Sequence, residues 1–271
     1  MPELPEVETT RRGIKPFVEQ QRLMQLVIRQ SRLRWPVSPE LPEAVEGERV
    51  EKLTRRGKYL LMHFAHGTLI WHLGMSGRLR IVPQEQVVEA HDHVDAIFES
   101  GKVLRLTDPR RFGSLLWTAE DPQQHVLLKR LGPEPLSVDL TIDYLYEKSL
   151  RSKQPIKNFI MDSHVLVGVG NIYANESLFL AGIAPQKATN QVPKLRLQRW
   201  LDVMRQVLSQ AIEQGGTTLK DFVGGDGKPG YFQQALKVYG RGGKPCLSCG
   251  HALTEVRLAQ RTTVFCKICQ T

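Results

Sequence analysis

Residues 246–249 read Cys-Leu-Ser-Cys and residues 266–269 read Cys-Lys-Ile-Cys, with sixteen residues between the two pairs. Each pair has the spacing that brings two thiolates onto one metal ion, and the intervening segment is long enough to form a hairpin. One zinc ion is therefore predicted on four thiolates, those of Cys246, Cys249, Cys266 and Cys269. Because four protein ligands leave no open coordination position, this zinc is expected to be structural rather than catalytic.

The composition favours a polyanionic partner. The 271 residues include 37 Lys and Arg against 28 Asp and Glu, a formal net charge of +9. No apolar run approaches the length of a membrane span, and the acidic N-terminus does not resemble a signal peptide. We therefore expect a cytosolic protein of about two domains with reduced cysteines and no membrane partner.

Before the finger, the hydrophobic pattern divides the chain into two parts. Alternating short segments over residues 22–118 favour a β-sandwich or barrel, and an amphipathic helix precedes them. The predicted strands are Leu23–Arg34, Arg49–Arg56, Tyr59–Ala65, Thr68–Leu73, Gly77–Val82, His93–Glu99, Lys102–Thr107 and Gly113–Thr118. After Asp121 the period becomes helical. The predicted helices are Val126–Leu131, Ile142–Leu150, Ile156–Met161, Ile172–Ala181 and Lys194–Gln214.

Two glycine-containing segments call for separate interpretation. Residues 215–230 hold six glycines, and such a long loop in a compact domain is functional or disordered. Gly170 precedes a predicted helix at which Asn171 is expected to be the N-terminal cap, beside backbone N–H groups that can hold a phosphate. Neither segment matches a dinucleotide or triphosphate motif, so no nucleotide cofactor is expected.

Residues 91–95 read His-Asp-His-Val-Asp, which places His91, His93 and Asp95 on one face of a strand. Such a face can hold a metal ion. The pattern favours instead a hydrogen-bonded strand face, or a contact from His91 to a phosphate.

The N-terminus offers a nucleophile. Removal of Met1 before Pro2 leaves a secondary amine, and α-amino groups have a lower pKa than lysine, so more of the amine is neutral at pH 7. An amine that attacks an aldehyde-like carbon forms a Schiff base, and the adjacent Glu3 can transfer the proton. Many chains begin with Met-Pro and simply start a helix, so the terminus alone does not establish catalysis.

Several motifs resemble those of the bacterial formamidopyrimidine-DNA glycosylase family, in the same order along the chain. They are residues 2–8 (PELPEVE), 58–60 (KYL), 72–77 (HLGMSG), 107–113 (TDPRRFG), 169–174 (VGNIYA) and the terminal four-cysteine finger with Gln260 and Arg261. The resemblance covers essentially the whole chain, and no position that the family uses for catalysis departs from its pattern.

The resemblance implies an α+β protein with three parts. These are an N-terminal helix and β-sandwich over residues 1–120, a helical helix-two-turn-helix domain over 121–240 that carries the flexible loop 215–230, and a zinc β-hairpin finger over 241–271. It further implies a bifunctional enzyme that excises oxidised purines, 8-oxoguanine and formamidopyrimidines, from duplex DNA and then cleaves the strand. A monomer in the bacterial cytoplasm, associated with the nucleoid when bound to DNA, is the corresponding expectation.

The same resemblance assigns roles to individual residues. Pro2 is the expected nucleophile at the sugar C1′ and Glu3 its acid–base partner, while Lys58 assists β-elimination and Arg261 assists δ-elimination. The expected DNA-binding residues are His91, Arg110, Lys153 and Asn171. The residues expected to fill the space left by the flipped base are Met75, Arg110 and Phe112. The residues expected to close over that base are Thr217, Thr218 and Lys220.

Two other interpretations remain open. The endonuclease VIII branch of the same superfamily prefers oxidised pyrimidines, but its usual opening has Gly where Leu4 stands here, and it lacks the motif of residues 108–113. From charge and cysteines alone, the chain also fits a zinc-finger DNA-binding protein without catalysis.

Overall fold

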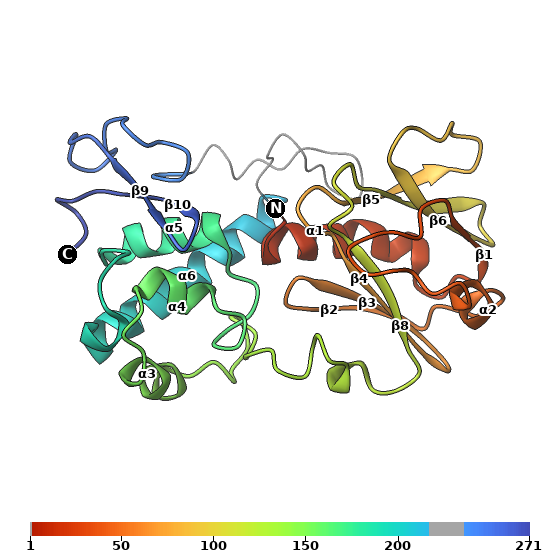
Figure 1. Cartoon of the computed structure of the whole chain (residues 1–271), viewed down its shortest axis with the longest axis horizontal. Helices are drawn as coiled ribbons and strands as arrows, with labels where there is room; N and C mark the ends of the chain where they lie inside the picture. The colour runs from red at the N-terminus through yellow and green to blue at the C-terminus, as the bar shows by residue number, and fades with distance from the viewer. Residues whose placement is uncertain (1, 217–235) are drawn as a thin grey trace. The chain divides into compact units, whose positions relative to one another are not determined.

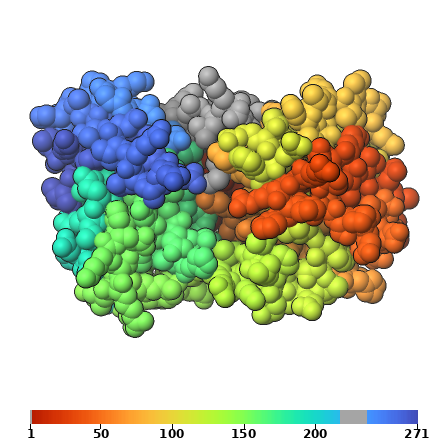
Figure 2. All heavy atoms as spheres, viewed as in Figure 1, coloured from red at the N-terminus to blue at the C-terminus, as the bar shows by residue number. Residues whose placement is uncertain are grey.

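The computed structural model describes residues 2–216 and 236–271. These residues form two compact units, one of residues 2–130 with 214–216 and the other of residues 131–213 with 236–271 (Figure 1). Side chains fill the gaps between the ribbons of each unit (Figure 2). No helix in the part of the chain that the structure describes has both the length and the apolar content needed to span a membrane.

The first unit is a β-sandwich, as predicted. One antiparallel sheet has the order β1 (Leu23–Ile28), β6 (Asp92–Phe98), β7 (Lys102–Thr107) and β5 (Arg78–Pro83). The other has the order β2 (Lys52–Arg56), β3 (Tyr59–Phe64), β4 (Gly67–His72) and β8 (Ser114–Thr118). Buried side chains of both sheets, among them Leu60 and Leu104, belong to one apolar core. The alternation of buried and exposed residues that predicts the strands is what supplies this core.

Helix α1 (Leu4–Val18) packs on the sandwich through a stripe of Leu4, Val7 and Ile14, which are completely buried. Pro5 is the second residue of α1, where its missing N–H is tolerated. A second helix, α2 (Leu41–Val45), is too short for its periodicity to be detected in the sequence, and it buries only its two ends.

The largest departures from the predicted elements of this unit are one strand end and one helix. The first strand ends at Ile28 instead of Arg34, because the backbone N–H groups of Arg29 and Gln30 both donate to the carbonyl oxygen of His93, at 2.8 and 3.3 Å. The helix predicted from Val126 to Leu131 does not form. Turns occupy residues 126–130, and a short 3-10 helix, η1 (Pro122–Gln124), lies just before them. Val126 is 67% exposed and Leu128 1%, so the segment has no apolar stripe to bury.

The second unit is helical with a terminal hairpin, as predicted. Its elements are α3 (Ile142–Leu150), α4 (Ile156–Met161), α5 (Asn171–Ala181), η2 (Thr189–Gln191), α6 (Lys194–Glu213), β9 (Thr254–Leu258) and β10 (Arg261–Phe265). Nearly every residue of α5 is buried, and its Ser177 hydroxyl accepts a hydrogen bond of 3.0 Å from the indole of Trp200 in α6. Helix α5 is thus the central helix of this unit.

Candidate functional site

Glu3 is held directly before the start of α1. Glu3 is 2% exposed, and its backbone N–H donates to the carboxylate of Glu6 at 2.9 Å in a reciprocal capping box. Pro2 is buried beside it. Gly216, with φ of +80°, lies against Glu6, because a Cβ at this glycine would be 3.3 Å from the Glu6 carboxylate. Gly216, the last described residue before the gap in the glycine-rich segment, therefore contacts the first turn of α1.

Lys58 lies in the tight turn between β2 and β3, where Gly57 has a φ of +55°. The Arg55 guanidinium donates to the carbonyl oxygen of Gly57 at 2.9 Å and forms an ion pair of 3.2 Å with Glu8 of α1. Glu8 therefore links the helix that follows Pro2 and Glu3 to the turn that carries Lys58. This bridging role of Glu8 and Arg55 is not evident from the sequence.

The Glu8 carboxylate forms ion pairs with three arginines, Arg11, Arg12 and Arg55. Burial would raise its pKa, but hydrogen bonds from Arg11 and Arg12 and the charges of Arg11 and Arg55 outweigh burial and lower the pKa to about 2. Because the carboxylate is ionised in the folded protein well below its ordinary pKa, it contributes stability above about pH 4.5, and this contribution is lost as the pH falls towards 2.

We expect Glu8→Gln to lower the free energy of unfolding at neutral pH by about 1 to 2 kcal/mol, a value reduced from the full linkage energy because the carboxylate is partly solvated. The difference from the unsubstituted protein should shrink as the pH falls below about 4.5. Urea unfolding at a series of pH values measures this difference. Glu43→Gln, at an exposed carboxylate of α2, is the matched control. A Glu8→Gln deficit that does not change between neutral and acidic pH would contradict this assignment.

His72, at the end of β4, is a neighbour of Lys58 that sequence reasoning missed. Burial and the nearby charges of Lys58 and Arg34 lower its pKa to about 4. Its ring packs on that of Tyr59, with centroids 4.8 Å apart, and its Nδ1 accepts a hydrogen bond of 3.1 Å from the N–H of Gly74. A neutral ring thus fixes the start of the loop that carries Met75. The sequence feature that could have indicated this role is the position of His72 at the start of the motif of residues 72–77.

The residues expected to enter DNA lie on the loops of the first unit. Met75 is half-buried, whereas His91 and Arg110 are exposed and Phe112 is 41% exposed. The Arg110 guanidinium lies over the Phe112 ring, 4.8 Å from its centroid. A Cβ at Gly74 would be 2.3 Å from the backbone of Phe112, so the structure brings the loops of Met75 and Phe112 into direct contact.

The alternative metal site at His91, His93 and Asp95 is wrong. Asp95 is held by the guanidinium groups of Arg105 and Arg29, at 2.8 and 2.6 Å. Hydrogen bonds and charges from the same two arginines lower the pKa of Asp95 despite its burial. Among the described residues, the only group of three or more potential ligands placed for a metal is that of the four cysteines.

In the second unit, Asn171 is the first residue of α5, and Gly170 is the N-terminal cap. The prediction that Asn171 is the cap is therefore wrong, and its side-chain amide donates to the carbonyl oxygen of Thr262 at 3.0 Å instead. Thr262 follows Arg261, which is exposed at the start of β10. Lys153 is exposed in the segment between α3 and α4.

The hairpin that carries Arg261 has a second anchor that sequence reasoning missed. Lys157 of α4 is 1% exposed, and its ammonium donates to the carbonyl oxygen of Thr262 at 3.0 Å and to the Thr263 hydroxyl at 2.7 Å. The turn before Arg261 consists of Ala259 and Gln260, both with positive φ, as a tight hairpin turn requires. The backbone next to Arg261 is thus fixed on both sides.

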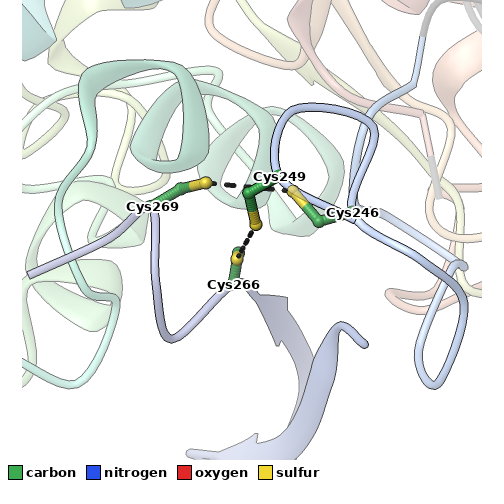
Figure 3. Close-up of side chains that lie close together, drawn as sticks. All are labelled: Cys246, Cys249, Cys266 and Cys269. Carbon is green, nitrogen blue, oxygen red and sulfur yellow. Dashed lines mark hydrogen bonds between the residues drawn. The ribbon is translucent and has the colours of Figure 1, made fainter. Parts of the chain in front are cut away.

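The four cysteines converge on one point from the loop after Lys244 and from the end of β10 (Figure 3). All four sulfur atoms lie within 4.8 Å of one another, with Cys246 and Cys269 3.9 Å apart and Cys249 and Cys266 3.4 Å apart. Sulfur atoms on a tetrahedral zinc stand about 3.8 Å apart, since each Zn–S bond is about 2.3 Å. The four thiolates are positioned to bind one zinc ion with no open position.

Three of the predicted site residues, Thr217, Thr218 and Lys220, lie outside the described residues, as does most of the predicted loop 215–230.

A β-sandwich with exposed cationic loops and a helical unit with a four-cysteine finger together define a zinc-finger protein of the DNA-binding class. Family models match three consecutive regions of the chain: the formamidopyrimidine-DNA glycosylase N-terminal domain over residues 1–115, its H2TH domain over 131–223, and a zinc finger found in FPG and IleRS over 243–271. The chain belongs to the formamidopyrimidine-DNA glycosylase family.

Individual relatives are similar to this chain along its full length. Formamidopyrimidine-DNA glycosylases of Marinomonas sp. strain MWYL1 and Hahella chejuensis are 57% and 55% identical, over all of both chains. The MutM (Fpg) protein of Thermus thermophilus has a similar crystal structure, with 37% identity and a TM-score of 0.89 over 99% of this chain and 98% of that one. A Lactococcus lactis Fpg variant, solved in complex with DNA containing Fapy-dG, gives 33% identity and a TM-score of 0.91 over 99% of each chain.

Proposed function

We infer that the chain is a bifunctional DNA glycosylase and AP lyase that excises oxidised purines, 8-oxoguanine and formamidopyrimidines, from double-stranded DNA in base excision repair. The observation that carries this function is the buried Pro2-Glu3 terminus, whose helix is linked through Glu8 and Arg55 to the turn of Lys58. The Lactococcus lactis relative was solved in complexes with DNA containing Fapy-dG or an abasic site, which supports damaged duplex DNA as the partner.

The proposed chemistry uses the terminal amine as the nucleophile. The neutral nitrogen of Pro2 attacks the sugar C1′, the bond to the base breaks, and a Schiff base forms between Pro2 and the opened sugar. Glu3 exchanges the protons that base departure and ring opening require. Lys58 assists β-elimination at the 3′ side of the sugar, and Arg261 assists δ-elimination at the 5′ side.

The other predicted residues bind and reshape DNA. His91, Arg110, Lys153 and Asn171 contact the DNA, mostly through phosphates. An extruded base leaves a gap that costs a few kcal/mol unless it is filled. Met75, Phe112 and Arg110 fill it as a flexible apolar plug, an aromatic wedge and a donor to the orphaned cytosine.

The remaining assignments follow from the same function. Thr217, Thr218 and Lys220 close over the extruded base, and the zinc ion positions the finger without taking part in the chemistry. The enzyme acts as a monomer in the bacterial cytoplasm and at the nucleoid. Boundaries near residues 120 and 240 separate its catalytic, helix-two-turn-helix and finger domains.

Borohydride trapping on a duplex with 8-oxoguanine opposite cytosine tests this function. We expect a reduced covalent adduct that maps to Pro2 of the N-terminal peptide. An adduct on Lys58 would retain the lyase activity but overturn the assigned nucleophile. Trapping on oxidised pyrimidines alone would indicate an endonuclease VIII-like enzyme. Tight binding with no adduct, in a chain verified to begin at Pro2, would indicate a lesion-binding protein without catalysis.

A further inference from the structure

We propose that Asp108 is a positioning residue that fastens three loops of the first unit into one rigid support for Met75, Arg110 and Phe112. The loops are residues 73–77, the turn that ends at His91 together with the first two residues of β6, and residues 108–113, here called the three-loop cluster. The inference rests on the proposed function, because it concerns how those side chains enter DNA.

The carboxylate of Asp108 joins the first loop to the third. Asp108 is completely buried. Its Oδ1 accepts a hydrogen bond of 2.7 Å from the Ser76 hydroxyl, and its Oδ2 accepts one of 2.8 Å from the backbone N–H of Gly113. Both carboxylate oxygens are therefore used, one by the residue after Met75 and one by the residue after Phe112.

The main chain of Asp108 joins the second loop to the same point. Its N–H donates to the carbonyl oxygen of His91 at 3.0 Å. Its carbonyl oxygen lies 2.8 Å from Nε2 of His93 and accepts a hydrogen bond of 3.1 Å from the N–H of Arg111. One residue thus holds all three loops of the cluster.

Two further contacts tighten the junction of the first and third loops. The Ser76 hydroxyl oxygen accepts a hydrogen bond of 3.3 Å from the N–H of Arg110, so Ser76 relays the Asp108 contact to Arg110 itself. Gly74 packs directly on the backbone of Phe112 and Gly113, where no side chain would fit. The backbone segments that carry Met75 and Phe112 are thereby fixed relative to one another.

The environment of Asp108 indicates that it orients the loops rather than adding to the stability of the fold. In the described part of the chain Asp108 forms no ion pair, so a buried carboxylate is satisfied by neutral donors alone, which makes each donor costly to remove. His91 and Arg111 beside it have φ of +76° and +55°, a conformation that non-glycine residues adopt only when their surroundings enforce it. Asp108 thus holds the strained backbone of its two neighbours in place, while Arg110 and Phe112 stay exposed.

This arrangement predicts a defect in base extrusion rather than in sugar chemistry. An intact lesion requires the cluster to enter the duplex as the base leaves, whereas an abasic site has no base to remove. Loosening of the cluster should therefore impair excision of 8-oxoguanine more than cleavage at an abasic site. It should also weaken the preference for cytosine over adenine opposite the lesion, since that preference depends on the position of Arg110.

The test compares Ser76→Ala, Asp108→Asn and Asp108→Ala with Ser149→Ala. Ser149 is a buried serine of α3 whose hydroxyl donates to the Tyr146 carbonyl oxygen, so its loss is a matched control. We expect Ser76→Ala to reduce single-turnover excision of 8-oxoguanine opposite cytosine by roughly tenfold or more, because it removes both the buried hydrogen bond to Asp108 and the one from the Arg110 N–H. Cleavage at an abasic site should change much less, and the cytosine preference should fall. Asp108→Asn should retain more excision than Asp108→Ala, because its side-chain oxygen can still accept from Gly113.

The fluorescence of 2-aminopurine next to the lesion reports unstacking directly, and we expect a slower signal in Ser76→Ala and an unchanged one in Ser149→Ala. Equal losses on both substrates, or no loss in Ser76→Ala, would overturn the positioning role. Failure of the unsubstituted protein on both substrates would instead overturn the proposed function, so the two failures are distinguishable.

Discussion

A chain with an uncleavable residue before Pro2 is expected to lose base excision by roughly a thousandfold or more, the scale seen when a nucleophile is removed. It should keep most of its affinity for duplex DNA, because the extension removes no phosphate contact. Acylation converts the secondary amine of Pro2 to an amide, whose nitrogen has no lone pair available for attack. Retention of Met1 has the same effect.

The size of this effect follows from the state of the free terminus. An α-amino group with a pKa near 8 is neutral in roughly a tenth of molecules at pH 7, against about one lysine in several thousand. The capping box of Glu3 and Glu6 fixes the backbone directly after Pro2, so the amine needs little reorganisation to reach a substrate.

Single-turnover excision of 8-oxoguanine measures the loss, and filter binding or fluorescence anisotropy measures the retained affinity. The control carries the same extension at the C-terminus, and mass spectrometry verifies each terminus. If the N-terminally extended chain excises 8-oxoguanine at an unchanged rate, Pro2 is not the nucleophile.

The sequence predicted those features that depend on local patterns. The sandwich follows from alternation, the finger from cysteine spacing, and Ile142–Leu150 and Ile156–Met161 from helical period, with both helices ending where predicted. The first strand was predicted too long, since what ends it is a contact from His93, about 65 residues away in the chain. Local pattern carries no information about such a partner.

The supports of the site were unpredictable for the same reason. Lys157 reads as a surface cation, yet it is buried against Thr262 and Thr263, more than 100 residues later. Asp108 lies within a recognisable motif, but its hydroxyl partner Ser76 belongs to another loop. Residue types with reactive groups can be identified from sequence, whereas the residues that orient them depend on tertiary packing.

Removal of zinc is expected to unfold the finger and reduce DNA affinity by about a hundredfold at moderate salt, the scale of several lost phosphate contacts. The finger has little apolar core of its own. Phe179, Val238, Leu253 and Val264 pack around the cysteines, and Cys246 and Cys266 are themselves part of this small cluster. Zinc binding is worth about 10 to 16 kcal/mol in finger peptides, far more than such a cluster supplies.

Loss of the finger should disorder Arg261 while the sandwich stays folded. The hydrogen bonds from Lys157 and Asn171 hold Thr262 only while β9 and β10 remain paired, and this pairing ends at Phe265, directly before Cys266. Because these contacts all lie within the second unit, the core of the first unit is independent of them. Thermal unfolding should therefore show a lost or separate transition for the second unit and a retained one for the sandwich.

Cys266→Ser and Ser248→Ala make the decisive comparison. Ser248 lies between the predicted zinc ligands Cys246 and Cys249. Its backbone N–H donates to the Cys246 sulfur at 3.4 Å, so alanine at this position preserves that contact. We expect Cys266→Ser to release zinc and lose affinity, and Ser248→Ala to retain both, as measured by a zinc indicator and DNA titration. A zinc-free protein that binds damaged duplex as tightly as the zinc-loaded one would show that the finger does not hold DNA. DNA affinity would then reside in the cationic loops and helices, and Arg261 would have to reach phosphate without a folded support.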